Sequence, residues 1–266
     1  MVFDVIVVGS GSAGLSAAIT AAENGASTLM IEKNAELGGT SGWSVGSITT
    51  SASPHQRAAD IYDTPDQHFS DMELFHSERL EGRDNIKLRR LLVDNTPPTF
   101  DWLLSLGLVF YGPMPEPPHT QPRMHNILPN SRMLIHQLSK AASTVGVEIR
   151  PSTALEDLLV EQGRVTGIVA NGEKIRARRG VILAAGDFSS NDTLKKRYMP
   201  ANMARIDGVN FSEPPSGELR DAILAAIGQY KVLVLKGEPL PVAVSRAFAR
   251  EFGPLQERLS RKTAVS

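Results

Sequence analysis

The sequence predicts an α/β fold with a central parallel sheet, and three observations carry this prediction. A buried strand, a glycine-rich turn, a helix and a second buried strand follow one another near the N-terminus. Residues 147–185 hold short strands that alternate apolar and polar residues and lead into a further buried strand. Helical patterns and a proline-rich loop lie between these blocks and predict a helical insertion.

Composition excludes several classes of protein. The 266 residues are 41% hydrophobic with 22 glycines, as expected for a globular chain of one large or two smaller domains. Basic residues number 28 and acidic residues 29, a balance that argues against a nucleic-acid-binding surface. Because cysteine is absent, disulfides, cysteine-ligated metals and thiol nucleophiles are excluded.

The N-terminal residues enter a strand directly, without the basic and apolar regions of a signal peptide. No apolar run approaches the ~20 residues of a membrane span. We therefore expect a cytoplasmic protein with no membrane span.

The first βαβ unit is the best-defined part of the sequence. Residues 5–8 form a continuous β-branched run, typical of a strand buried on both faces. Residues 9–14 form the glycine-rich turn, and the alanine-rich residues 15–24 predict a helix ended by Gly25. Residues 29–31 form the next strand, which closes at Glu32 and Lys33.

The middle of the chain predicts loops and helices. Residues 38–54 are rich in Gly, Ser and Thr and predict a long polar loop. Residues 66–107 predict two helices separated by the Pro97-Pro98 pair, since proline disrupts a helix interior. Residues 112–122 hold five prolines and predict no regular structure, whereas residues 132–144 predict a further helix.

The later part of the chain predicts a β-meander. Residues 157–161, 165–170 and 174–177 alternate in polarity and are separated by Gln-Gly and Asn-Gly turns. A buried strand over 181–186 follows, and beyond residue 200 the patterns support one helix at 218–227 and one strand at 232–235. We divide the chain into segments 1–60, 61–146, 147–200 and an incomplete or divergent 201–266.

The C-terminal segment carries a rough apolar stripe beside basic residues, interrupted by Pro254. Three interpretations remain open: a weakly docked helix, which we favour, a partner-binding helix, and a membrane-surface helix. The stripe consists of Val244, Phe248, Phe252, Leu255 and Leu259.

The turn at residues 9–14 reads G-x-G-x-x-G and lies between a strand and a helix, the context of a dinucleotide site. Gly9 permits the tight turn, Gly11 admits a diphosphate near the backbone, and Gly14 allows close helix packing. The helix N-terminus attracts phosphate, and Glu32 can accept hydrogen bonds from a ribose. The alternative is a plain α/β turn.

Two features favour FAD over NAD as the dinucleotide. The Gly38-Gly39-Thr40-Ser41 loop follows the ribose-binding acid closely, and the meander leads into the sequence VILAAG at 181–186. An NAD-binding protein remains the less favoured alternative.

The chain resembles a known superfamily in DVIVVGSGSAG (4–14), IEK (31–33), GGTS (38–41), SVG (44–46) and VILAAGDFSSN (181–191). It is similar to the FAD-dependent fumarate reductase, succinate dehydrogenase flavoprotein and 3-ketosteroid dehydrogenase superfamily. The resemblance implies a Rossmann-like FAD-binding domain, with departure at Asp187, where relatives carry a second glycine. The implied FAD contacts are Gly9, Ser10, Gly11, Ser12, Ala13, Gly14, Glu32, Lys33, Gly39, Thr40, Ser41, Gly46, Ser47, Ala185 and Gly186.

Some relatives attach FAD covalently through a histidine before the second glycine loop. Thr40 stands at that position here, so the resemblance implies non-covalent FAD. Relatives also have a cap domain and a closing C-terminal segment, both of which this chain is expected to lack. A fragment, a truncated product or half of a split enzyme completed by a second polypeptide all fit this pattern.

Substrate-side candidates are few. Arg123 can clamp a carboxylate and His125 can donate a proton, although an exposed loop arginine and histidine are the plainer interpretation. Trp43, Tyr111 and His119 are further candidates. The remaining histidines lack metal-ligand spacing, so we predict no metal site.

The resemblance implies hydride exchange between flavin N5 and a C–C bond next to a carbonyl or carboxylate of a small-molecule substrate. The competing hypothesis is a catalytically incomplete FAD-binding subunit or remnant.

Overall fold

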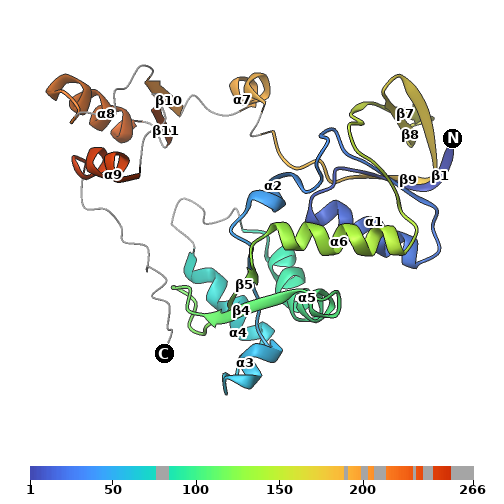
Figure 1. Cartoon of the computed structure of the whole chain (residues 1–266), viewed down its shortest axis with the longest axis horizontal. Helices are drawn as coiled ribbons and strands as arrows, with labels where there is room; N and C mark the ends of the chain where they lie inside the picture. Colours follow the sequence, from blue (N-terminus) through green and yellow to red (C-terminus); the bar gives the residue numbers. More distant parts are fainter. Residues whose placement is uncertain are drawn as a thin grey trace. The chain divides into compact units, whose positions relative to one another are not determined.

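The computed structural model describes residues 1–75, 84–188, 191–198, 203–206, 214–229, 232–235 and 242–252. The chain forms two compact units, Met1–Gly186 and Asp187–Ser266. The first unit contains β1 (Val2–Val8), α1 (Ser12–Glu23), β2 (Thr28–Ile31), α2 (Gly39–Trp43), β3 (Ser47–Thr49), α3 (Pro54–Ala58), α4 (Pro65–Asp71), the 3₁₀ helix η1 (Met72–Phe75), α5 (Ile86–Ser105), β4 (Val109–Met114), β5 (Met124–Leu128), α6 (Arg132–Thr144), β6 (Glu148–Arg150), β7 (Leu155–Glu161), β8 (Arg164–Ala170) and β9 (Glu173–Leu183) (Figure 1).

A six-stranded sheet organises the first unit, in the order β6-β2-β1-β9-β8-β7. β6, β2, β1 and the second half of β9 pair in parallel, whereas β7, β8 and the first half of β9 form an antiparallel meander. Gln162 and Asn171 begin its two turns with φ of 51° and 48°, and a glycine follows each. The α/β fold with a parallel sheet and a meander is confirmed. The predicted strands at 174–177 and 181–186 belong to one strand, β9, which ends at Leu183, and the prediction that this second strand is buried is wrong because Ile182 and Leu183 are exposed.

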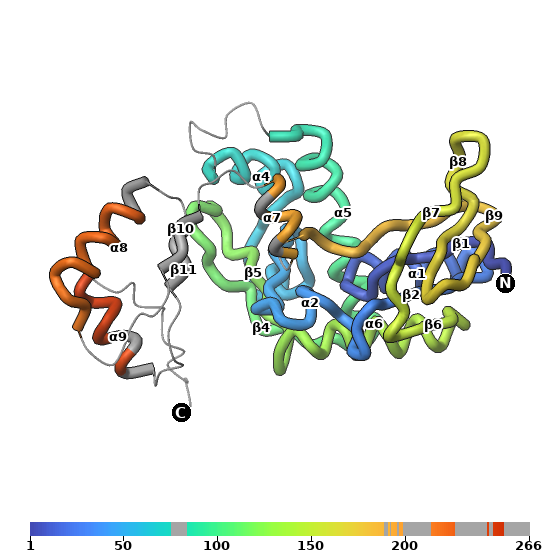
Figure 2. The backbone as a smooth tube through the Cα atoms, turned by 90° about the horizontal axis from the view of Figure 1, so that it is seen from above, coloured from blue at the N-terminus to red at the C-terminus, as the bar shows by residue number. Residues whose placement is uncertain are grey.

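The alternating side chains of β1 supply two cores. Val7 faces helices α1, α5 and α6, where it joins Leu15, Phe100 and Leu138. Figure 1 shows α1 and α6 lying side by side on this face of the sheet. Ile6 and Val8 face the other side of the sheet, where residues of β8 and β9 cover them. Figure 2 shows the β7–β8 hairpin at the end of the unit away from β4 and β5.

A second, antiparallel sheet has the order β3-β5-β4. Its edge strand β4 extends to Met114, so the prediction that residues 112–122 lack regular structure is wrong for residues 112–114. Proline is tolerated at position 113 because β4 pairs on one side only, and its partner register shifts there. Gly112 is required, since a Cβ would lie 2.6 Å from the carbonyl oxygen of Met124.

Helix α5 runs through both Pro97 and Pro98, so the predicted break between two helices is wrong. The carbonyl of Val93, which loses the N–H of residue 97, accepts a 3.4 Å hydrogen bond from the Thr96 hydroxyl. Val93 and Phe100, on either side of the prolines, are completely buried. Packing of this apolar face therefore outweighs the local cost of proline.

The predicted polar loop at 38–54 contains α2 and β3. In the second unit, α8 (Gly217–Gln229) and β11 (Val232–Leu235) confirm the helix at 218–227 and the strand at 232–235. Helix α9 (Val242–Arg250) includes Val244 and Phe248 of the apolar stripe. Leu255 and Leu259 lie outside the described residues. None of the helices in the described part of the chain combines the length and apolar character needed to cross a membrane. The second unit contains α7 (Asp192–Tyr198), β10 (Met203–Ile206), α8 (Gly217–Gln229), β11 (Val232–Leu235) and α9 (Val242–Arg250).

Candidate cofactor-binding site

The glycine turn after β1 is packed too tightly for side chains at two positions. Gly9 has φ of +100°, and a Cβ there would lie 2.5 Å from the carbonyl oxygen of Ala184. A Cβ on Gly14 would lie 1.9 Å from the carbonyl oxygen of Gly9. Both glycines therefore allow the turn to pass between α1 and the end of β9.

Gly11 has a different environment. Its φ of −63° suits any residue, and the atom nearest to a Cβ added at this position would be the Ser41 Oγ at 3.5 Å. Gly11 is the N-cap of α1, where the first backbone N–H groups point out of the helix. A small residue at this helix end lets an anion such as the diphosphate of a dinucleotide come close, because the N–H groups and the helix dipole favour negative charge.

Ser41 lies at the same helix end. Its hydroxyl accepts a 3.2 Å hydrogen bond from the Ser12 N–H and lies 3.0 Å from the Ser12 hydroxyl. Gly38 directs the chain there with φ of +112°, and a Cβ on it would lie 2.8 Å from Ile135. The predicted contacts Gly39 and Thr40 are exposed on α2.

Glu32 ends the second strand with its carboxylate turned toward the glycine turn. It accepts hydrogen bonds from the Ser10 N–H (3.0 Å), the Ser10 hydroxyl (2.7 Å) and the Asn34 N–H (2.9 Å). Burial alone would raise the pKa of this carboxyl, but the three hydrogen bonds lower the pKa by more than burial raises it, so the net shift is downward. A carboxylate has about four acceptor positions, which leaves room for a ribose hydroxyl. The neighbouring Lys33 is exposed.

A cavity of about 530 Å³ adjoins the N-terminus of α1. Leu103, Ile127 and Leu138 contribute to its apolar wall, and serines and a threonine contribute polar groups, a combination suited to an aromatic cofactor. Ala185 and Gly186, at the end of β9, are exposed and do not line this cavity. The predicted contacts that line it are Ser12, Ala13, Thr40, Ser41, Gly46 and Ser47.

The structure places Arg123 in the interior, with zero exposure. Its guanidinium donates to Asp63 at 2.6 and 2.7 Å and to Asp71 at 2.5 Å. Burial lowers the pKa of Arg123, but hydrogen bonds to the two carboxylates raise it more. Because all three guanidinium nitrogens are engaged, this geometry favours a structural role over a carboxylate clamp.

His125 is also completely buried, on β5. Its Nδ1 donates to the Arg123 carbonyl at 2.7 Å, so in the neutral ring Nε2 accepts from the Ser53 hydroxyl at 3.0 Å. Burial is the main cause that lowers the pKa of His125. Trp43 and Tyr111 are 74% and 61% exposed.

Histidines that are distant in sequence form pairs in space. The rings of His68 and His119 lie 5.2 Å apart, and those of His55 and His125 lie 5.5 Å apart. His119 Nδ1 lies 3.0 Å from the Arg123 guanidinium and accepts its hydrogen bond. Within the described ranges, no group of three or more His, Asp or Glu residues is arranged to hold a metal ion.

Comparison with known proteins adds the family. The model of the family described as "FAD binding domain" matches residues 4–209. The chain is 31% identical over 208 residues to NADH:fumarate oxidoreductase of Klebsiella pneumoniae, covering 74% of this chain and 22% of that protein. It is 29% identical over 257 residues to fumarate reductase (cytochrome) of Shewanella frigidimarina, covering 88% and 43%.

Among solved structures, the chain is similar to 3-ketosteroid-delta4-(5alpha)-dehydrogenase of Rhodococcus jostii, with a TM-score of 0.64 and 26% identity. The match covers 74% of this chain and 48% of that one. The chain thus spans less than half the length of these three proteins.

Proposed function

Because the chain belongs to the FAD binding domain family, we propose that it is the cofactor-binding part of an oxidoreductase that exchanges a hydride between flavin N5 and an activated C–C bond. The single observation that carries the proposal is the cavity of about 530 Å³ beside Ser12 and Ala13 at the N-terminus of α1. The resemblance to fumarate and ketosteroid oxidoreductases supports a C–C bond next to a carboxylate or carbonyl as the reaction centre.

FAD supplies two-electron chemistry at its flavin ring when bound. In the proposed arrangement, the α1 N-terminus and Ser41 hold the diphosphate, and Glu32 accepts hydrogen bonds from the adenosine ribose. The apolar wall to which Leu103, Ile127 and Leu138 contribute would pack against the flavin ring.

The cofactor part of the proposal is tested by substituting Gly11 with valine. A valine suits the backbone conformation of Gly11, and its side chain would lie beside the Ser41 hydroxyl, where the proposal places the diphosphate. Gly180→Ala is the matched control, because a Cβ there meets no atom within 4 Å. We expect Gly11→Val to weaken FAD binding at least about tenfold in a fluorescence titration, and Gly180→Ala to leave it unchanged. Equal affinity in all three proteins would contradict the site.

The reaction is tested by dye-linked turnover of the flavin-loaded protein with enoates, dicarboxylates and 3-ketosteroids. Reduction or reoxidation of bound flavin by one of these classes supports the oxidoreductase proposal. Bound flavin that reacts with dithionite but with none of these compounds supports the second candidate, a catalytically incomplete FAD-binding subunit.

One structural observation favours that second candidate. The register of β9 with β8 ends at Arg176, whereas its register with β1 continues to Leu183. Residues 177–183 therefore pair with β1 on one side only. On the side away from β1, no strand in the described part of the first unit pairs with their backbone groups. Ile182 and Leu183 on this stretch are 39% and 59% exposed, and the groove between Ile182 and α1 has a volume of about 460 Å³.

We propose that a further polypeptide segment adds a strand to this edge and packs in the groove, which would complete the sheet. Amide hydrogen exchange tests this proposal. Residues 177–183 are expected to exchange quickly in this chain alone and slowly in a complex with a second polypeptide that restores flavin turnover. Unchanged exchange in such a complex would count against strand addition.

A further inference from the structure

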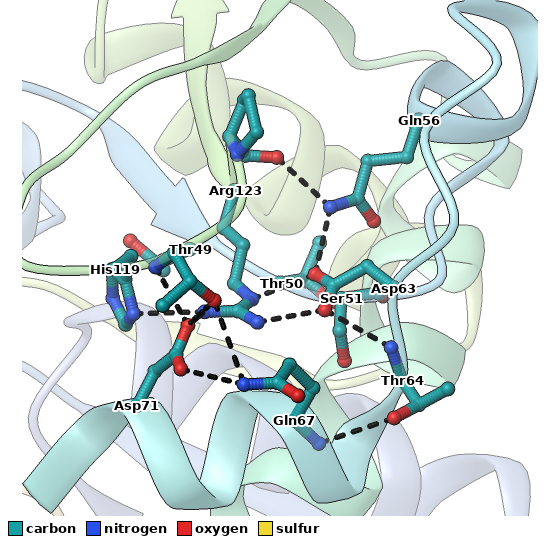
Figure 3. Close-up of polar contacts among 12 residues, drawn as sticks. Thr49, Thr50, Ser51, Gln56, Asp63, Thr64, Gln67, Asp71, His119 and Arg123 are labelled. Carbon is teal, nitrogen blue, oxygen red and sulfur yellow. Dashed lines mark hydrogen bonds and ion pairs between the residues drawn. The ribbon is translucent and has the colours of Figure 1, made fainter.

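Arg123 joins two parts of the first unit through different atoms. Its side chain reaches Asp63, which precedes α4, and Asp71, the last residue of α4 (Figure 3). Its main chain precedes β5 directly and contacts the chain that follows β3. The orientation of one residue therefore links α4 to the β3–β5 pair.

The side-chain end of this link is held rigidly. Asp63 receives two parallel hydrogen bonds from the guanidinium and a third, of 2.9 Å, from the Gln56 amide. Asp71 accepts a hydrogen bond from the third guanidinium nitrogen. It also accepts hydrogen bonds from the Thr120 N–H at 2.7 Å and the Thr120 hydroxyl at 2.6 Å. Paired donors of this kind fix direction as well as distance.

The main-chain end of this link lies where β3 pairs with β5. The Arg123 carbonyl accepts the Thr50 N–H at 3.1 Å and the His125 Nδ1–H at 2.7 Å. In the β3–β5 pairs next to this contact, Ile48 lies opposite His125 and Ser47 lies opposite Asn126. The Ser47 hydroxyl donates a 2.6 Å hydrogen bond to the Asn126 side chain. Ser47 and Ile48 both line the cavity beside α1.

Stability alone is a poor explanation for this buried cluster. Burying a guanidinium and two carboxylates costs desolvation energy, and well-packed apolar residues often replace such groups without loss of stability. A fixed fork is better suited to defining an orientation. We infer that Arg123 is a positioning residue: it sets the register of β3 on β5 and thereby places Ser47 and Ile48 at the cofactor cavity. This inference rests on the proposed function, which assigns that cavity to the flavin.

The test compares two buried arginines, each paired with two carboxylates. Arg89 on α5 is 5% exposed and contacts Glu73 at 2.8 Å and Asp84 at 3.4 Å, and neither of these partners lies on β3 or β5. Arg89→Met is therefore the control for Arg123→Met. Two readouts are used: amide exchange of residues 47–50 and 124–128 without FAD, and the visible circular dichroism of added FAD.

Arg123→Met is expected to speed amide exchange in these segments about tenfold and to alter the visible dichroism of bound FAD, whereas Arg89→Met changes neither. Arg123→Lys keeps the charge without the fork and is expected to restore thermal stability but not the dichroism. Wild-type exchange and dichroism in a folded Arg123→Met protein would overturn the inference.

If Arg123→Met does not fold, Asp63→Asn is tested instead, because this substitution removes one carboxylate and leaves Asp71 in place. Altered exchange at residues 47–50 in this variant supports the inference, and wild-type exchange overturns it. Failure of the wild-type protein to bind FAD would reject the proposed function, while the exchange readout would still decide whether Arg123 sets the register.

Discussion

The Ser10 hydroxyl donates a 2.7 Å hydrogen bond to the Glu32 carboxylate and accepts a 3.0 Å hydrogen bond from the Gly38 N–H. Ser10 is an unspecified position of the glycine motif, yet its side chain is completely buried. One hydroxyl thus connects the glycine turn, the residue after β2 and the residue before α2. Glu32, which the proposal assigns to the ribose, is therefore oriented by the same turn that the proposal places next to the diphosphate.

The first prediction concerns this hydroxyl. Ser10→Ala is expected to lower the free energy of unfolding by about 1–3 kcal/mol, because Glu32 and the Gly38 N–H each lose a buried partner. FAD affinity is expected to fall as well, since Glu32 loses one of the bonds that orient it. Urea denaturation and FAD titration measure the two effects. Ser70→Ala on the exposed face of α4 is the control, and equal stability of the two variants would contradict this role of Ser10.

The second prediction concerns Gly14. Gly14→Ala places a methyl group 1.9 Å from the Gly9 carbonyl oxygen, a clash with backbone that side-chain rotation cannot relieve. We expect a loss of melting temperature far larger than in Gly217→Ala, where a Cβ meets no atom within 4 Å. A Gly14→Ala protein with wild-type stability, measured by thermal denaturation, would show that α1 can move away from the turn.

The third prediction is that FAD is held without a covalent bond. The resemblance aligns Thr40 with the position where some relatives of the superfamily carry a flavin-linked histidine, and threonine has no imidazole nitrogen for such a link. Precipitation of the flavin-loaded protein with trichloroacetic acid should leave the yellow colour in the supernatant. Colour retained in the pellet after washing would contradict non-covalent binding.

Local patterns explain which features the sequence could predict. The strand–turn–helix around Gly11 and the turn at Asn171 depend on neighbours a few residues away, and the structure has both elements there. The environment of Arg123 depends on Asp63 and Asp71, which lie 60 and 52 residues earlier in the chain. No local spacing reports such a pairing, and burial by tertiary packing likewise kept α5 continuous through Pro97.

Protonation of the buried histidines connects this arginine cluster to stability. His68 is 3% exposed, and its buried Nδ1 has no hydrogen-bond partner among the residues that the structure describes. Burial lowers the pKa of His68 to about 4, and the charges of Arg123 and His119 act in the same direction, against Asp63 and Asp71. Burial and Arg123 also lower the pKa of His119.

The last prediction follows from the sign of these shifts. Between pH 6.5 and about 4 the unfolded chain binds a proton at His68 that the folded chain does not bind, so stability is expected to fall as pH falls through this window. The full loss from His68 is on the order of 3 kcal/mol. Urea denaturation at pH 7 and pH 5 should show a shallower loss in His68→Phe than in the wild type, with His136→Phe on the exposed side of α6 as the matched control. An unchanged pH dependence in His68→Phe would mean that other groups cause the acid sensitivity, because only removal of the titrating ring abolishes its proton uptake on unfolding.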